Sequence, residues 1–345
     1  MSFINSISEG PSKRETRFEL LRIIAMSMVL IVHADFYSIV GPDGNEFSVS
    51  PISAWFRTVL EFSSLVCVNL FIVISGWFGI KATLRGLCSF LFQCFFFLFT
   101  IYFLSILFGF SVLSLKGFIN NFLLSPMNWF IFSYIELYLL SPIINSYLRT
   151  AEQREILRLT IILITFDVLL GWSSIAPFFM KGYSPLTFIE LYLAGFLLRR
   201  YWTDRYRHAL GLFFAMVALN SALYYAQVND YIIVPSLTSY NSPIVLVQTI
   251  AFFAWFTTLN IKQSAIINFI SSSAFAVYLL HTNLGFIGSV FKKSIVNIYS
   301  QYSGLACLLL ITLFCILVFI MALLFDQPRK IMWKKISTLV PKYKF

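Results

Sequence analysis

Charged residues are scarce in this chain. Asp, Glu, Lys and Arg together make up 12% of its 345 residues, whereas 59% of the residues are apolar. Soluble domains carry about 25% charged residues, so this composition argues against folding in water and indicates a lipid bilayer as the solvent. Apolar runs follow one another along almost the whole chain, and no soluble domain interrupts them. We therefore expect an all-α polytopic membrane protein.

Cysteine and histidine are scarce as well. The five cysteines lie inside apolar runs, their number is odd, and no CxxC pair occurs. This pattern argues against a disulfide framework and against a metal site, so we predict no bound metal. Only three histidines occur, which leaves few positions for the side chain best suited to proton transfer near neutral pH.

Acidic residues are outnumbered by basic ones, which gives a formal net charge of +10. The basic residues occur in short clusters between apolar segments, and this distribution is typical of residues that set membrane orientation. The lipid bilayer is therefore an expected partner, and nucleic acid is not.

Ten apolar segments are plausible membrane spans. With the N-terminus in the cytoplasm, 19 of the 25 lysines and arginines lie on the cytoplasmic side, five lie outside and Arg22 lies within the first span. This excess favours both termini in the cytoplasm. We predict a cytoplasmic tail at 1–16, a membrane domain at 17–329 and a basic cytoplasmic tail at 330–345. The predicted spans are 18–40, 57–80, 87–110, 127–148, 156–173, 186–200, 206–227, 244–261, 268–291 and 303–325.

The first span carries the ionisable residues Glu19, Arg22 and His33 among its apolar residues. On a helix Arg22 and His33 point from one face within about 20° and are separated by about 16 Å along the axis. An ionisable residue in a span costs at least about 2.5 kcal/mol on insertion scales, so a functional interpretation is the default. Glu19 and Arg22 alternatively form an interfacial ion pair that helps to set orientation. In the functional interpretation, Arg22 binds phosphate and Glu19 holds it in place.

Two of the histidines, His33 and His281, lie within predicted spans, whereas His208 lies in a cationic loop. A buried neutral imidazole is satisfied by one interhelical hydrogen bond, so a structural role is open for each of the two. The alternative is that one of them is a general base that takes a proton from a hydroxyl group. The sequence leaves open which of the two takes the proton.

The second span and the loop after it contain further candidates. Asn69 and Ser75 are polar residues in an apolar run that ends at Gly76, where small residues also favour close helix packing. Arg85 follows in the loop and is a second candidate for binding phosphate, although lone loop cations more often set orientation.

Later spans contribute four candidates for substrate binding or support. Trp129, Tyr134 and Glu136 lie in the fourth span, and Tyr278 lies three residues before His281. Because a carboxyl group exposed to lipid is costly, we expect Glu136 to face the interior of the helix bundle.

The order of these residues resembles the acyltransferase family 3 membrane enzymes, which acylate sugars and other surface molecules of bacteria. The opening pattern of the family is similar to Arg17, Glu19, Arg22 and His33 here, with Glu19 in place of the usual Asp. Its second-span pattern is matched by residues 68–76, with Asn69 in place of Asp. Residues 129–142, 278–281 and 326–329 are similar to later motifs of stand-alone members.

The resemblance implies about ten spans in a bacterial inner membrane and an acyl-coenzyme A donor. The acyl group is most commonly acetyl, and the donor is a co-substrate instead of a permanently bound cofactor. The acceptor is a hydroxyl of a surface glycan or lipid-linked sugar. The protein either modifies that acceptor directly or hands the acyl group to a relay partner outside the membrane.

The expected mechanism joins this donor to the first span. Arg22, with Arg85, holds the donor's phosphates, and the pantetheine arm extends to His33 as general base. Ser75 and Tyr278 are candidate donors to the developing oxyanion. A transporter or flippase for a lipid-linked glycan is the main alternative, because it also needs intramembrane charges and about ten helices. A signalling or scaffold protein is a third interpretation.

Overall fold

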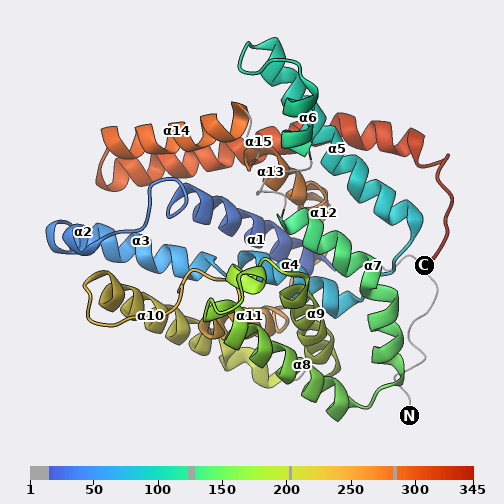
Figure 1. Cartoon of the computed structure of the whole chain (residues 1–345), viewed down its shortest axis with the longest axis horizontal. Coiled ribbons are helices and arrows are strands. Elements are labelled where there is room, and N and C mark those ends of the chain that lie inside the picture. Colours follow the sequence, from blue (N-terminus) through green and yellow to red (C-terminus); the bar gives the residue numbers. More distant parts are fainter. Residues whose placement is uncertain (1–14, 123–128, 202–203, 283–285) are drawn as a thin grey trace.

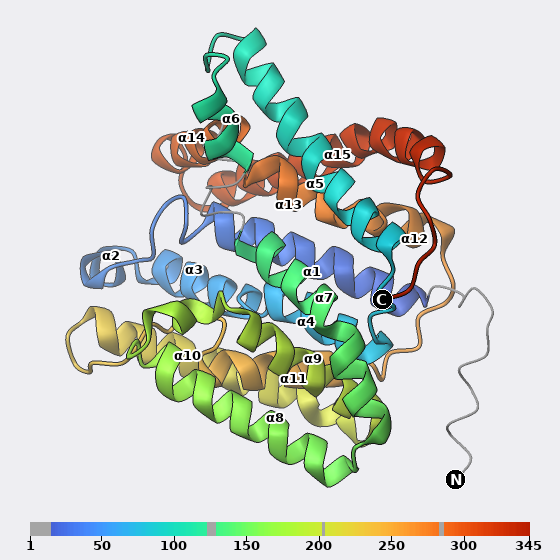
Figure 2. The same cartoon turned by 45° about the vertical axis from the view of Figure 1, so that its right-hand side comes forward.

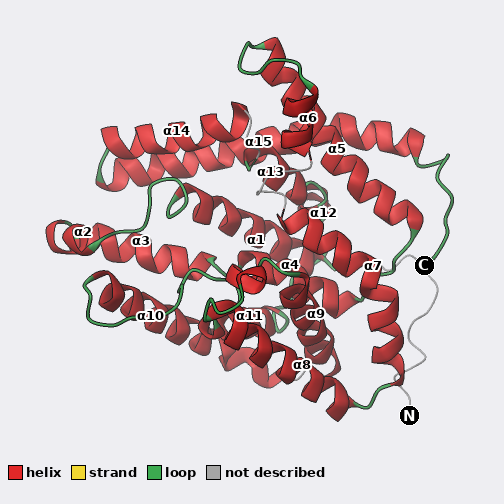
Figure 3. Cartoon of the chain, in the orientation of Figure 1, coloured by secondary structure: helices red, strands yellow, loops and turns green. Residues whose placement is uncertain are grey.

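The computed structural model describes residues 15–122, 129–201, 204–282 and 286–345. Helices and loops account for these residues, apart from one isolated β-bridge between Thr83 and Lys344 (Figure 3). The helices are α1 (Thr16–Ala34), α2 (Gly44–Val49), α3 (Pro51–Ser64), α4 (Cys67–Phe78), α5 (Leu84–Leu107), α6 (Leu115–Phe122), α7 (Trp129–Thr150), α8 (Gln153–Asp167), α9 (Pro185–Arg200), α10 (Ala209–Val228), α11 (Pro243–Phe256), α12 (Ala265–Ser271), α13 (Ala274–His281), α14 (Phe286–Gln301) and α15 (Gly304–Ile336).

Local sequence signals set several of the helix ends. Helices α3, α9 and α11 begin with proline, which lacks the N–H group that would be left unpaired at a first helical position. Thr83 and Ser184 cap α5 and α9 by accepting from backbone N–H groups of their first turns. Helix α4 ends at Gly79, whose positive φ of 74° stops the helix.

Four helical stretches of the described residues are long and apolar enough to cross a membrane: Pro51–Phe78, which joins α3 and α4, Leu84–Leu107, Tyr206–Val228, which includes α10, and Gly304–Ile336. Helix α5 shows how such a helix meets lipid. Its residues Leu91, Phe95, Phe99 and Phe103 recur every four positions and are all exposed. Exposed large apolar residues at helical spacing form a face suited to acyl chains. The predicted all-helical class is confirmed for the described residues, and the four long apolar helices support a multi-pass membrane protein.

The helices follow the predicted apolar segments in part, and the predicted span 57–80 is divided between α3 and α4. Helix α1 ends at Ala34 instead of near residue 40, because the backbone leaves helical geometry at Asp35, where φ is −88° and ψ is −96°. The predicted span 268–291 is wrong as one segment. A serine-rich turn at Ser272 separates α12 from α13, and a further helix, α14, begins at Phe286. The predicted tail at 1–16 lies almost wholly outside the described residues.

The basic segment 330–345 is more ordered than a simple tail. Helix α15 continues to Ile336 as part of a 33-residue helix. After it, the N–H of Leu84 donates to the carbonyl of Tyr343, and the N–H of Phe345 donates to Ala82. The end of the chain is thereby attached to the segment that precedes α5.

Close packing of α4 against α9 forms the centre of the core. Gly76 of α4 faces the backbone of Tyr192, and Gly195 of α9 faces the carbonyl of Val73, so a Cβ atom at either glycine would overlap backbone atoms. Small residues at a helix crossing permit this approach, as the sequence suggested for Gly76.

Helix α1 lies between two groups of helices. Figures 1 and 2 both show α4 and α8 to α11 on one side of it, and α5 and α13 to α15 on the other. Its first half packs on α4 and α12, and it also contacts α3 and α13. Because both groups meet at α1, its polar residues are placed inside the bundle.

Candidate active site

A cavity of about 320 Å³ lies beside α1, in the interior of the bundle. The residues that line it come from α1, α4, α5, α7, α12, α13 and four connecting segments. They are Arg22, Met26, Val29, His33, Tyr37, Val68, Phe71, Ser75, Phe90, Gln93, Trp129, Phe130, Tyr134, Tyr183, Tyr240, Ser271, Ser272, Ala274, Phe275 and Tyr278. Arg22 and His33 thus face the same space, three helical turns apart, as their spacing predicted.

Glu19 fixes the arginine end of the cavity. Arg22 Nη1 donates to Glu19 Oε1 at 2.5 Å, and Ser271 Oγ donates to Glu19 Oε2 at 2.5 Å. Glu19 is buried, whereas the Arg22 side chain is 31% exposed. The carboxylate therefore orients the guanidinium from behind and leaves part of it open to the cavity, in a geometry suited to an anionic ligand.

The two intramembrane histidines form a hydrogen-bonded pair. His33 Nδ1 lies 2.8 Å from His281 Nε2, and His281 Nδ1 lies 2.6 Å from the carbonyl oxygen of Val277. A carbonyl only accepts, so His281 Nδ1 carries hydrogen and, in a neutral ring, its Nε2 is an acceptor. His33 Nδ1 must then be the donor, which leaves the lone pair of a neutral His33 on Nε2. His33 lines the cavity, and His281 lies buried behind it.

Three aromatic rings cover another wall of the cavity. Trp129 stacks on Tyr183 with ring centroids 4.1 Å apart and on Tyr240 at 5.8 Å. Asn69 does not line the cavity; its side chain is buried and donates to the carbonyl of Tyr240 at 2.9 Å. Asn69 therefore supports the segment that carries one of these rings.

The hydroxyl groups of Ser75, Tyr134 and Tyr278 belong to residues that line the cavity. Ser75 Oγ donates its hydrogen to the carbonyl of Phe71 at 2.9 Å. In this arrangement Ser75 has no second hydrogen to offer an oxyanion. Tyr278 stacks on Phe275 and lies three residues before His281 on α13.

Arg85 and Glu136 also lie outside the cavity lining. Arg85 donates through Nε at 3.0 Å and Nη2 at 2.5 Å to the carbonyl of Val340, so its guanidinium holds the C-terminal segment. Glu136 is exposed on α7. The expectation that Glu136 faces the bundle interior is wrong, because the helix presents Leu137 and Ser133 to the interior instead. The geometry gives no support to Arg85 as a second phosphate ligand.

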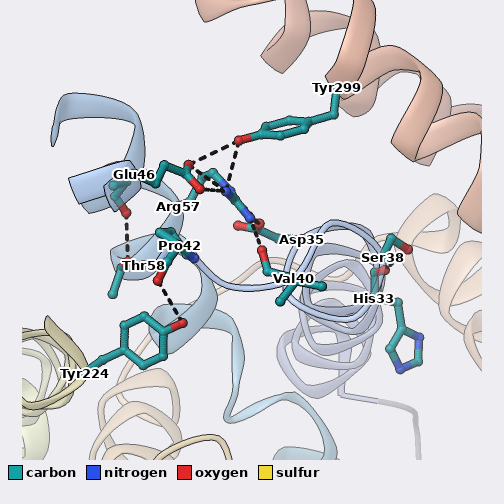
Figure 4. Close-up of polar contacts among 11 residues, drawn as sticks. His33, Asp35, Ser38, Val40, Pro42, Glu46, Arg57, Thr58, Tyr224 and Tyr299 are labelled. Atoms are coloured by element: carbon teal, nitrogen blue, oxygen red, sulfur yellow. Dashed lines mark hydrogen bonds and ion pairs between the residues drawn. The ribbon is translucent and has the colours of Figure 1, made fainter. Parts of the chain in front are cut away.

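A buried ion-pair network lies just beyond the histidine end of α1 (Figure 4). Arg57 Nε donates to Asp35 Oδ1 at 2.8 Å, while its Nη1 donates to Glu46 at 2.7 Å and to Tyr299 Oη at 3.0 Å. The Nη2 group also donates to the carbonyl of Val40. The network therefore connects the turn after α1 to α2, α3 and α14, and fixes the backbone close to His33.

Sequence reasoning missed several residues of this region. Tyr183 and Tyr240 lie in loops, where no periodicity marks a residue as part of a site. Arg57 is one of the five basic residues that the predicted topology places outside, and the structure buries it. Asp35, a carboxyl group two residues after His33 in an apolar context, was a signal that an intramembrane partner should exist.

The fold and the cavity together define a multi-pass membrane protein that gathers ionisable and hydroxyl side chains in one interior space. The chain belongs to the acyltransferase family 3, because the family model described as an acyltransferase domain matches residues 15–326. The protein is therefore a membrane O-acyltransferase, as the sequence motifs indicated. No curated protein and no solved structure matches the chain.

Proposed function

We propose that the protein transfers an acyl group, most commonly acetyl, from acyl-coenzyme A to a hydroxyl group of a surface glycan or lipid-linked sugar. The observation that carries this proposal is that Arg22 and His33 line one cavity at positions about 16 Å apart along α1. An extended donor with phosphates at one end and a thioester at the other fits two functional groups separated in this way.

The donor is oriented by charge. Its phosphate groups bind Arg22, which Glu19 holds in position, and its pantetheine arm extends along the cavity. The walls of that path are largely apolar, including Met26, Val29 and Phe71. An apolar path favours an arm with few charges and excludes water from the thioester.

His33 is the general base. Its Nε2 takes the proton from the acceptor hydroxyl as the hydroxyl oxygen bonds to the thioester carbon. The carbon–sulfur bond then breaks, the sulfur leaves with its electron pair, and the imidazolium returns the proton to give the thiol. His281 positions the base, because its Nε2 accepts from His33 Nδ1 before and after the proton moves.

The acceptor binds against the aromatic wall. Trp129, Tyr183 and Tyr240 present stacked rings beside the cavity that contains His33. Aromatic faces with a few hydroxyl groups match the apolar face and polar edge of a sugar ring. This arrangement supports a carbohydrate as the acceptor class.

Membrane orientation completes the proposal. In the proposed topology, ten spans cross a bacterial inner membrane and both termini lie in the cytoplasm. This topology places Arg22 near the cytoplasmic surface and His33 in the outer half of the membrane. The excess of basic residues on the cytoplasmic side supports this orientation. The donor then enters from the cytoplasm and the acceptor from outside.

The test uses purified protein in vesicles with acetyl-coenzyme A and a lipid-linked sugar acceptor. We expect release of free thiol together with an acetylated sugar, detected by mass spectrometry. Accumulation of unmodified sugar on the far side of the vesicle, without thiol release, would instead identify a transporter and contradict the proposal.

A further inference from the structure

Gln93 on α5 carries the one amide side chain among the described residues that line the cavity. Phe90 lies one helical turn before it and lines the same space. The Phe90 ring lies 5.2 Å, centroid to centroid, from the rings of Tyr134 and Phe275. Because residues three apart project from one face of a helix, α5 presents an aromatic ring and an amide to the cavity. No step of the proposed mechanism uses this amide.

A buried carboxylate behind the cavity sets the orientation of the Gln93 amide. Gln93 Nε2 lies 3.4 Å from Asp326 Oδ1. Asp326 is fully buried, forms an ion pair with Arg329, and accepts from Arg329 Nε at 2.8 Å and from Ser273 Oγ at 2.8 Å. An ionised carboxylate only accepts hydrogen bonds, so it requires the NH₂ end of the amide. The carbonyl oxygen Oε1 of Gln93 is therefore the end that remains for a ligand.

The structure gives Gln93 Oε1 no donor within the described part of the chain, where the contact with Asp326 is the hydrogen bond of this side chain. The serines of the cavity lining have already used their hydrogens. Ser271 donates to Glu19 at 2.5 Å, and Ser272 donates to the carbonyl of Phe269 at 2.6 Å. A ligand in the cavity must then supply the N–H or O–H group that Oε1 can accept.

Hydrogen-bond direction separates the role of Gln93 from that of Arg22. Ionised phosphate oxygens accept, so they suit the guanidinium of Arg22 and not a carbonyl oxygen. The pantetheine arm of coenzyme A contains two amide groups, and each has an N–H group that would be costly to leave unpaired in a largely apolar cavity. From this geometry we infer that Gln93 Oε1 accepts a hydrogen bond from an amide N–H of the donor's arm, and that Gln93 thereby helps to select the donor. The inference rests on the proposed function, because it takes acyl-coenzyme A as the donor.

The experiment compares two donors in the same detergent: acetyl-coenzyme A, and an analogue in which esters replace the two amides of its arm. The analogue keeps the phosphates, the thioester and the length of the arm but has no amide N–H. For the wild-type protein we expect kcat/KM to be about two- to tenfold higher with the amide arm, which is the range of one neutral hydrogen bond. For Gln93→Leu, kcat/KM with acetyl-coenzyme A should fall by that factor. With the ester analogue it should be no lower than for the wild-type protein, which also shows that the variant is folded.

The matched control is Gln301→Leu, which removes an exposed amide at the end of α14 that does not line the cavity. It should leave both values unchanged. An equal loss with both donors for Gln93→Leu would overturn the inference, because it would show that Gln93 supports Asp326 or the fold and does not read the arm. A wild-type protein that uses both arms equally well would overturn it too. The proposed function fails only if the wild-type protein transfers no acetyl group from acetyl-coenzyme A, so the two failures are distinguishable.

Discussion

At the scale of single residues, the histidine pair determines what the cavity can do. The carbonyl of Val277 fixes the hydrogen on His281, and His281 in turn fixes the hydrogen of His33 on Nδ1. The sequence left open which histidine takes the proton. The contacts favour His33, because it lines the cavity and His281 lies behind it.

Replacing His281 by Ala should therefore lower kcat while leaving the KM for donor and acceptor nearly unchanged. Loss of the positioning hydrogen bond allows the wrong tautomer and orientation of His33, and we expect a fall in kcat of about a hundredfold. Steady-state kinetics with both substrates checks this. The matched control is His208→Ala, an exposed histidine in the segment before α10 that should keep full activity. A rise in the acceptor KM without a change in kcat would argue for substrate binding by His281 instead.

The buried Arg57 network leads to a prediction about stability. Arg57→Met leaves Asp35 buried without its charge partner, and removing one member of a buried ion pair costs about 3–5 kcal/mol. The Tm of the detergent-solubilised variant should fall clearly below that of the wild-type protein. Arg154→Met, which removes an exposed arginine on α8, should leave the Tm unchanged. An unaffected Tm for Arg57→Met would show that the network is not stabilising.

Spacing alone could predict only part of this site. Arg22 and His33 lie on one continuous helix, so their shared face followed from helical geometry. The contacts of Arg85 with Val340 and of Lys330 with the serine turn join segments far apart in the sequence, and no local pattern contains that information. The predicted orientation of Glu136 is wrong for a related reason. The cost of exposing a carboxyl group to lipid does not determine which face of α7 packs inward.

At the scale of elements, the crossing of α4 and α9 holds the cavity walls. Val68, Phe71 and Ser75 line the cavity from α4, so a shift of this helix would move them. The close approach depends on Gly76 and Gly195, each of which faces the backbone of the opposite helix. Helix propensity would favour alanine at both positions, and tertiary packing overrides it.

Gly195→Ala should therefore destabilise the protein even though alanine is the better helix former, because its Cβ overlaps the carbonyl of Val73. The matched control is Gly211→Ala in α10, where a Cβ meets nothing within 4 Å. That change should be neutral or stabilising by about 0.5–1 kcal/mol. Thermal unfolding of both variants in one detergent gives the comparison. Equal Tm values would contradict the close-packing account.

At the scale of the whole molecule, the apolar segments could be located from the sequence because the bilayer requires long apolar helices. The break at Ser272 and the helix α14 could not be located in this way. Helix α14 carries Lys292 and Lys293 and lacks the apolar run of a span. The count of ten spans and the cytoplasmic termini remain predictions from the distribution of basic residues.

Cysteine labelling in intact cells tests the orientation. In a variant without native cysteines, Tyr231→Cys lies in the connection after α10 and should react with a membrane-impermeant maleimide, because Tyr231 is 70% exposed and predicted to lie outside. Lys342→Cys should react only after the membrane is permeabilised. The reverse pattern would invert the proposed directions of donor and acceptor entry.

The central claim is that His33 removes the proton from the acceptor hydroxyl. The donor's phosphates bind at the other end of the same cavity. The most direct measurement is acyl transfer by His33→Ala, made together with equilibrium binding of labelled acetyl-coenzyme A to the same preparation. The account predicts that transfer falls by about 10²–10⁴-fold while donor binding stays close to that of the wild-type protein. Transfer at the wild-type rate with donor binding intact would contradict it.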